Sequence, residues 1–110
     1  MRIINLTPHV VNVYSDDSEI PFFLESFQSE GTARVSTVKA RRPTLGLIPV
    51  FTPKYGKVEN LPDQSGGIFY IVSAMVRQAL PNRYDIFSPG ELIRDSLGQP
   101  IGCKGLDQNL

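Results

Sequence analysis

The sequence has little of the chemistry from which metal and cofactor sites are built. Its 110 residues include one cysteine, Cys103, one histidine, His9, and no tryptophan. A lone cysteine excludes an intramolecular disulfide and a multi-cysteine metal site, and a lone histidine excludes a histidine-rich one. We therefore expect no metal and no cofactor. The scarcity of cysteine also fits a reducing cytoplasm.

An excess of charge and a long apolar run are missing too. Eleven Lys and Arg residues balance eleven Asp and Glu residues, so the formal net charge is zero. A general nucleic-acid binder needs a basic field, and we expect no such binding. No apolar run approaches the ~20 residues of a membrane-spanning helix. The first residues, MRIINLTPHVVNVY, are too polar for a signal peptide. These features predict a cytoplasmic protein that does not enter a membrane.

What is present predicts one globular domain over residues 1–110, because 41% of the residues are hydrophobic. Nine glycines and nine prolines divide the chain into short apolar segments. The expected fold class is mainly β or α+β, a small, strongly bent antiparallel sheet or barrel with one short helix at about residues 73–80. The expected strands are 3–4, 10–14, 20–27, 32–38, 45–51, 57–61, 68–72, 91–95 and 100–106. Hairpins are expected between 45–51 and 57–61 and, because a glycine-containing loop separates them, between 91–95 and 100–106.

The stretch GGIFYIVSAMVRQALP, residues 66–81, organises the rest of the chain. Residues 68–72 form an apolar run after two glycines, which is typical of a buried strand. Helix-forming residues follow Ser73, a favourable N-cap residue. Pro81 ends the helix, because proline cannot continue it. This stretch therefore predicts a strand, a tight turn and a helix of about two turns.

Three further segments predict loops or turns, and one apolar segment predicts a strand. The basic residues 39–43, KARRP, predict a solvated loop, since charge runs usually face water. Residues 52–56 and 88–90 contain proline and glycine and predict turns. Residues 20–27, IPFFLESF, predict a strand, with exposed apolar surface used in self-association as the alternative. Cys103 is expected to be buried and inert.

The helix that follows the central strand is also the candidate ligand site. Free N–H groups at a helix N-terminus can hold a phosphate or a carboxylate. Ser73 and Arg77 would assist, Arg83 or Arg94 would converge there, and Tyr70, Tyr84 or Phe87 would stack on a base. The alternative is that Ser73 only caps its own helix, that Arg77 is solvated, and that the other charges form ordinary surface pairs.

No catalytic motif accompanies these residues. Neither Ser73 nor Cys103 lies in a recognisable nucleophile motif, and His9 is either a hydrogen-bonded corner residue or a contact to a ligand. We expect binding without turnover; an enzyme using His9 or Asp85 as a general base is the least favoured hypothesis. The predicted ligand-binding residues are Thr7, His9, Tyr70, Ser73, Arg77, Arg83, Asp85 and Arg94.

Several short motifs spread along the chain carry a resemblance. They are NLTPH at 5–9, GKVENLP at 56–62, YIVSA at 70–74, NRYD at 82–85, SPG at 88–90, and IRD at 93–95 followed by Gly98, Ile101, Gly102 and Cys103. In these motifs the chain resembles a family of small hypothetical proteins encoded by tailed phages and by some bacteria, notably actinobacteria. Residues 20–42 match least. The family has no established activity, so no functional residue is carried over from it.

The resemblance implies a phage-type accessory protein of the host-cell cytoplasm. The leading hypothesis is a counter-defence protein that sequesters a small nucleotide-like anionic ligand, as a homo-oligomer. The alternative is a protein–protein inhibitor of a host defence complex, similar to an anti-CRISPR protein, that uses the IPFFLESF and KARRP segments. A structural role in a virion stays open.

Overall fold

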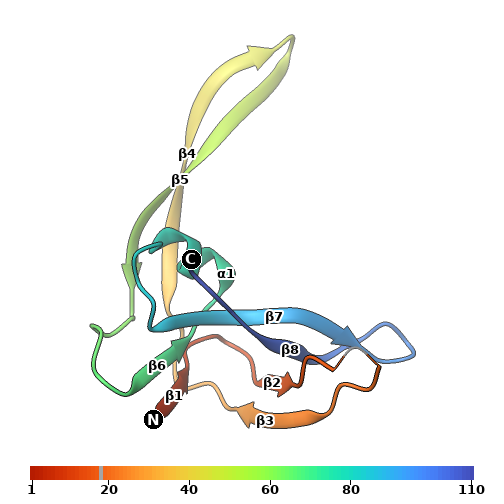
Figure 1. The fold of residues 1–110 in the computed structure, drawn as a ribbon. Helices are drawn as coiled ribbons and strands as arrows, with labels where there is room; N and C mark the ends of the chain where they lie inside the picture. The colour runs from red at the N-terminus through yellow and green to blue at the C-terminus, as the bar shows by residue number, and fades with distance from the viewer. Residues whose placement is uncertain (18) are drawn as a thin grey trace.

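The computed structural model describes residues 1–17 and 19–110. Over these residues the chain forms eight strands and one helix (Figure 1). In chain order they are β1 (Arg2–Asn5), β2 (Val11–Tyr14), β3 (Phe23–Phe27), β4 (Arg34–Leu45), β5 (Ile48–Glu59), β6 (Ile68–Ile71), α1 (Ala74–Ala79), β7 (Ile86–Arg94) and β8 (Pro100–Gln108). The expected fold class, mainly β with one short helix, is confirmed.

Six strands form one strongly bent sheet in the order β1-β6-β7-β8-β2-β3. It is mixed rather than antiparallel, since β1–β6, β6–β7 and β2–β8 are parallel pairs. The β6–β7 pair is parallel because the chain between these strands, which includes α1, is long enough to return to the end of the sheet at which β6 begins. The sheet nearly closes on itself: the amide of Glu30, just beyond β3, donates to the Asn5 carbonyl of β1 at 2.8 Å.

The central stretch is buried on both faces of this sheet. Tyr70 and Val72 lie in one core with Val76 of α1 and Ile86 of β7. Ile71 lies in a second core on the other face with Val11, Val13 and Cys103. A strand covered on both faces needs a continuous apolar run, and this is why residues 68–72 do not alternate. The predicted burial of Cys103 is confirmed, and burial raises the pKa of its thiol.

The predicted helix begins and ends where the sequence indicated. Ser73 is the N-cap, and its hydroxyl accepts a hydrogen bond from the Val76 amide at 3.2 Å. The chain leaves the helix at Leu80, one residue before Pro81. Val76 is buried, while Arg77 lies on another face. Among the described residues, no helix has the length and apolar character that crossing a membrane requires.

The strands β4 and β5 pair with each other and form a long hairpin, called the arm below, that projects from the sheet (Figure 1). The radius of gyration, 16.8 Å, reflects this projection, because a compact chain of this length has a radius of about 13 Å. The arm turns at Gly46, whose φ of 62° suits a glycine, and Leu47 at its tip is 99% exposed.

Four sequence predictions about residues of β4, β5 and β7 are wrong. Residues 39–43 lie within β4 and residues 52–56 within β5, so neither is a loop or a turn, although the basic residues are exposed as expected. Residues 88–90 lie within β7. The expected hairpin between 45–51 and 57–61 is replaced by pairing of Arg34 through Leu45 with Ile48 through Glu59. Proline is tolerated here because a two-stranded ribbon has two free edges.

Gly90 provides a test of how closely β7 and β8 pack. A Cβ atom at this position would meet the Lys104 carbonyl and lie 2.9 Å from the Gly105 carbonyl. We expect Gly90→Ala to lower the free energy of unfolding by about 2 kcal/mol, because neither backbone atom can move freely. Gly66→Ala, where a Cβ meets nothing within 4 Å, is the matched control. Urea unfolding followed by circular dichroism measures both, and equal midpoints would contradict the close approach.

Candidate functional site

A groove of about 400 Å³ lies where the arm joins the sheet. The loop after β1, both strands of the arm and the start of α1 form its walls. Its lining residues are Leu6, Thr7, Pro8, Thr32, Ala33, Arg34, Val35, Ser36, Glu59, Ser73, Met75 and Val76. Its volume lies within the range of small-molecule sites, about 300 to 1,000 Å³.

The groove combines an aliphatic floor with hydroxyl groups, one guanidinium and one carboxylate, that of Glu59. Leu6, Ala33 and Val76 belong to the core beneath it. Thr7, Thr32, Ser36 and Ser73 contribute four hydroxyl groups to its lining. Arg34 is exposed, and the two ion pairs of the described residues, Arg2–Glu30 and Arg83–Asp85, do not involve it. Because the Thr7 hydroxyl already donates within the protein, the groove can offer apolar contact, the hydroxyls of its other three lining residues and the Arg34 guanidinium to one ligand.

Thr7 belongs to a buried corner held by Asn5. The Asn5 amide nitrogen donates to the carbonyls of His9 at 2.7 Å and Phe27 at 2.9 Å. Its amide oxygen accepts from the Thr7 amide at 2.9 Å and from the Thr7 hydroxyl at 2.7 Å. The His9 imidazole is on the exposed side of this corner, while its carbonyl is the group that is bonded. The NLTPH motif therefore has a structural role as the corner between β1 and β2.

At α1, the structure agrees with one part of the alternative to a ligand site, namely that Ser73 caps its own helix. The Ser73 hydroxyl caps its own helix, and α1 has only six residues. Arg77 is not solvated, however: its Nε donates to the Ser88 hydroxyl at 2.8 Å and one terminal nitrogen donates to Asn109 at 3.3 Å. Arg77 thus joins α1 to β7 and to the C-terminal residues, away from the first turn.

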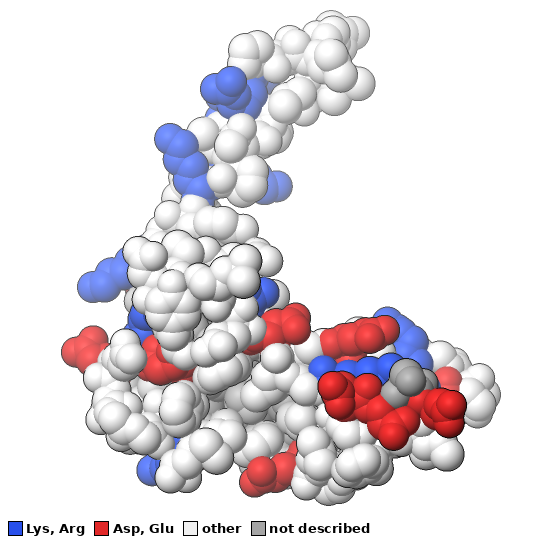
Figure 2. All heavy atoms as spheres, in the orientation of Figure 1, with Lys and Arg blue, Asp and Glu red and all other residues white. Residues whose placement is uncertain are grey.

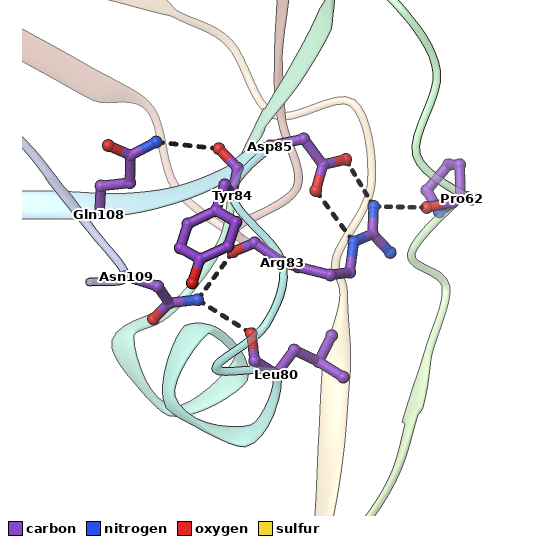
Figure 3. A network of polar contacts seen from close by, with 7 residues as sticks. All are labelled: Pro62, Leu80, Arg83, Tyr84, Asp85, Gln108 and Asn109. Atoms are coloured by element: carbon purple, nitrogen blue, oxygen red, sulfur yellow. Dashed lines mark hydrogen bonds and ion pairs between the residues drawn. The ribbon is translucent and has the colours of Figure 1, made fainter.

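Arg83 and Asp85 form a bidentate pair (Figure 3). The Arg83 Nε and one terminal nitrogen lie 2.9 and 2.6 Å from the two carboxylate oxygens, and the same terminal nitrogen donates to the Pro62 carbonyl at 3.0 Å. The side chain of Asp85 is 3% exposed and that of Arg83 21%. The hydrogen bonds to Asp85 raise the pKa of Arg83. The Arg83 guanidinium is therefore already bound by the Asp85 carboxylate.

The C-terminal residues close over the same region. The Asn109 amide donates to the carbonyls of Leu80 and Arg83, both at 2.9 Å, and Gln108 donates to the Tyr84 carbonyl (Figure 3). The Tyr84 hydroxyl donates to the Leu110 carbonyl at 2.9 Å. The segment after α1 is therefore held by side chains of the last residues, a contact that sequence spacing does not indicate.

The structure brings together only part of the predicted site. Thr7 and Ser73 line the groove, and Arg83 pairs with Asp85. Tyr70 is 3% exposed in the core, and Arg94 donates to the Gly98 carbonyl in the β7–β8 turn. Sequence reasoning missed Arg34, Ser36 and Glu59. Arg34 and Glu59 become neighbours only through the pairing of β4 with β5, which no local signal indicated.

Residues 1–17 and 19–110 contain no group of three or more His, Cys, Asp or Glu side chains placed to hold a metal ion. Comparison of the chain with protein-family models, with curated proteins and with solved structures gave no match. The interpretation of the groove therefore depends on its own residues.

Proposed function

We propose that this protein binds a small anionic, nucleotide-like ligand without turnover, in the groove at the base of the arm. The observation that carries this proposal is the size and lining of the groove, which places Arg34 beside four hydroxyl-bearing side chains and an aliphatic floor. A guanidinium suits a phosphate, hydroxyl groups suit a sugar, and aliphatic side chains suit the flat face of a base. The ligand would lie against Thr7 and Ser73, two of the residues predicted from sequence.

The role of such a protein follows from the resemblance to small phage proteins. A protein that binds a ligand and does not convert it lowers the free concentration of that ligand. We propose that the ligand is a nucleotide signal of a host defence system and that sequestration is the function. The protein would act in the cytoplasm of the host cell.

The test is a thermal-shift screen against cyclic nucleotides, cyclic ADP-ribose isomers, NAD and linear nucleotides, with chromatography of the recovered ligand. A ligand at a hundredfold excess over its dissociation constant stabilises the fold by about 2.7 kcal/mol. Recovery of the intact ligand supports sequestration, and recovery of an altered one indicates an enzyme. No shift with any compound in the screen would contradict the proposal.

The arginine that carries the site can be tested on any compound that binds. We expect Arg34→Gln to raise the dissociation constant 10- to 100-fold, because a hydrogen bond to a charged group contributes about 1.5 to 3 kcal/mol. Arg94→Gln, in the β7–β8 turn, is the matched control and should leave the affinity unchanged. Calorimetric titration measures both. An unchanged affinity for Arg34→Gln would remove the groove as the site.

The second candidate function is inhibition of another protein by direct contact. The observation that favours it is the exposure of the two segments that motivated it: Phe22, Phe23 and Leu24 are all more than half exposed, and the basic residues of KARRP lie on the arm. Its test is co-purification with a host protein at a fixed stoichiometry. Loss of that protein after substitution of the arm would support this candidate.

A further inference from the structure

The arm is a two-stranded ribbon whose side chains are exposed along most of its length when the described residues are considered. Its exposed apolar side chains include Val38, Leu45, Leu47, Ile48 and Phe51. An isolated two-stranded hairpin is only marginally stable in water, and an exposed apolar ribbon invites pairing with another chain. The arm therefore has the composition of a surface that is covered in the working protein.

The arm and the rest of the chain carry opposite net charges. The strands β4 and β5 carry six basic residues and one acidic residue, a net charge of +5. The rest of the chain carries the remaining five basic and ten acidic residues, a net charge of −5. The neutrality of the whole sequence thus results from two opposite charges of equal size on separate parts of the fold.

Several acidic side chains cluster, with basic side chains among them, at the end of the sheet away from the arm, and other acidic side chains are scattered over the sheet (Figure 2). Glu91 of β7 pairs in register with Lys104 of β8, which pairs with Tyr14 of β2, and Asp16 and Asp17 follow Tyr14 after one intervening residue. Glu25 of β3 lies opposite Val13, in the neighbouring strand pair. We call these four carboxylates, Asp16, Asp17, Glu25 and Glu91, the acidic end.

Exposed apolar side chains accompany the acidic end, as they do the basic arm. Phe22, Phe23 and Leu24 are exposed beside it, and backbone and side-chain hydrogen bonds join Phe22 to Ser15. On the arm, Lys39 and Arg41 lie about the ring of Phe51, at 6.0 and 5.8 Å from its centroid. The arm therefore offers apolar contact with mostly basic side chains, and the acidic end offers apolar contact with four carboxylates around Lys104.

We infer that the arm of one copy of this chain docks on the acidic end of a second copy. Figure 1 shows the arm pointing away from its own sheet, so it does not cover the acidic end of the same copy. A second copy is favoured over nucleic acid because a chain that carries −5 on its sheet repels a polyanion there, whereas another copy matches both surfaces at once. Each copy contributes its own arm and binds the arm of another copy. Two copies can therefore form a closed dimer by exchanging arms, or several copies can form a ring.

Sedimentation velocity of the full chain with paired charge reversals tests this inference. Lys39→Glu, Arg41→Glu and Arg42→Glu make the arm acidic, and Asp16→Lys, Glu25→Lys and Glu91→Lys make the acidic end basic. We expect the wild type to sediment as a multiple of 12.2 kDa and each triple variant as a 12.2 kDa monomer. A mixture of the two variants should assemble again, because the acidic arm of one now matches the basic end of the other.

The mixture also controls for misfolding, since chains that fail to fold cannot restore an assembly. A monomeric wild type, variants that assemble as the wild type does, or a mixture that stays monomeric would each overturn the inference. Capture of a nucleic acid or of a host protein by a monomeric wild type would assign the arm to that partner instead. None of these results depends on the groove, whose test is the affinity of the Arg34→Gln variant.

Discussion

Replacing Asn5 by Ala is expected to lower the free energy of unfolding by about 4 kcal/mol. The Asn5 side chain is fully buried and makes four hydrogen bonds, to the carbonyls of His9 and Phe27 and from the amide and hydroxyl of Thr7. Its removal leaves several of these buried groups without a partner, and each costs about 1 to 3 kcal/mol. Such a loss is a large part of the 5–15 kcal/mol that a domain has.

Urea unfolding followed by tyrosine fluorescence measures this loss. Asn82→Ala, in the exposed turn after α1, is the matched control and should change the stability by less than about 0.5 kcal/mol. A variant Asn5→Ala within 1 kcal/mol of the wild type would show that water replaces the amide, and the corner of NLTPH would then not depend on Asn5.

Arg83→Met is expected to lower the free energy of unfolding by about 3 to 5 kcal/mol, because it leaves the Asp85 carboxylate buried without a counter-charge. Asp85 lies at the start of β7, beside the central strand, and its carbonyl accepts from the Tyr70 amide at 2.9 Å. The double variant Arg83→Met/Asp85→Leu should recover much of the stability, since an apolar pair can replace a buried ion pair.

Thermal and urea unfolding of the single and double variants decide this prediction. Arg94→Met, whose guanidinium is exposed, serves as the control for loss of a positive charge. If the double variant is no more stable than Arg83→Met, the isolated carboxylate is not the cause of the loss. The contact of Arg83 with Pro62 would then be the more important one.

The parts of the fold that local signals determine were predictable. The elements β6 and α1 are specified by a two-glycine turn, an apolar run, a capping serine and a proline. These four signals lie close to one another in the sequence. The β7–β8 hairpin was expected at residues 91–106 because a glycine-containing loop separates two short β segments, and the structure confirms it. In each case the decisive residues are near in sequence.

The arm was predicted only in part: strands were expected at 32–38, 45–51 and 57–61, but the segments between them have the composition of loops. Three prolines, a glycine at the tip and a run of three cations within five residues all indicate loops when considered locally. Only the pairing of β4 with β5 over twelve residues each makes them a ribbon.

The candidate site was predictable only in part, for the same reason. Ser73, expected from its capping chemistry, and Thr7 were both among the predicted residues, and both line the groove. Arg77, Arg83 and Arg94 follow one another closely in sequence but are directed to Ser88, Asp85 and Gly98. Sequence order gives no information on which side of a sheet a side chain lies after a helix and a turn. Arg34 could only be found from the structure.

The two proposals describe one protein at two levels, a groove that binds a ligand and an arm that joins copies. Native mass spectrometry of the full chain with the nucleotide panel measures subunits and bound ligands together. We expect species at multiples of 12.2 kDa that carry one intact ligand for each subunit. A 12.2 kDa species that gains no mass from any compound would contradict both the groove and the arm as working surfaces.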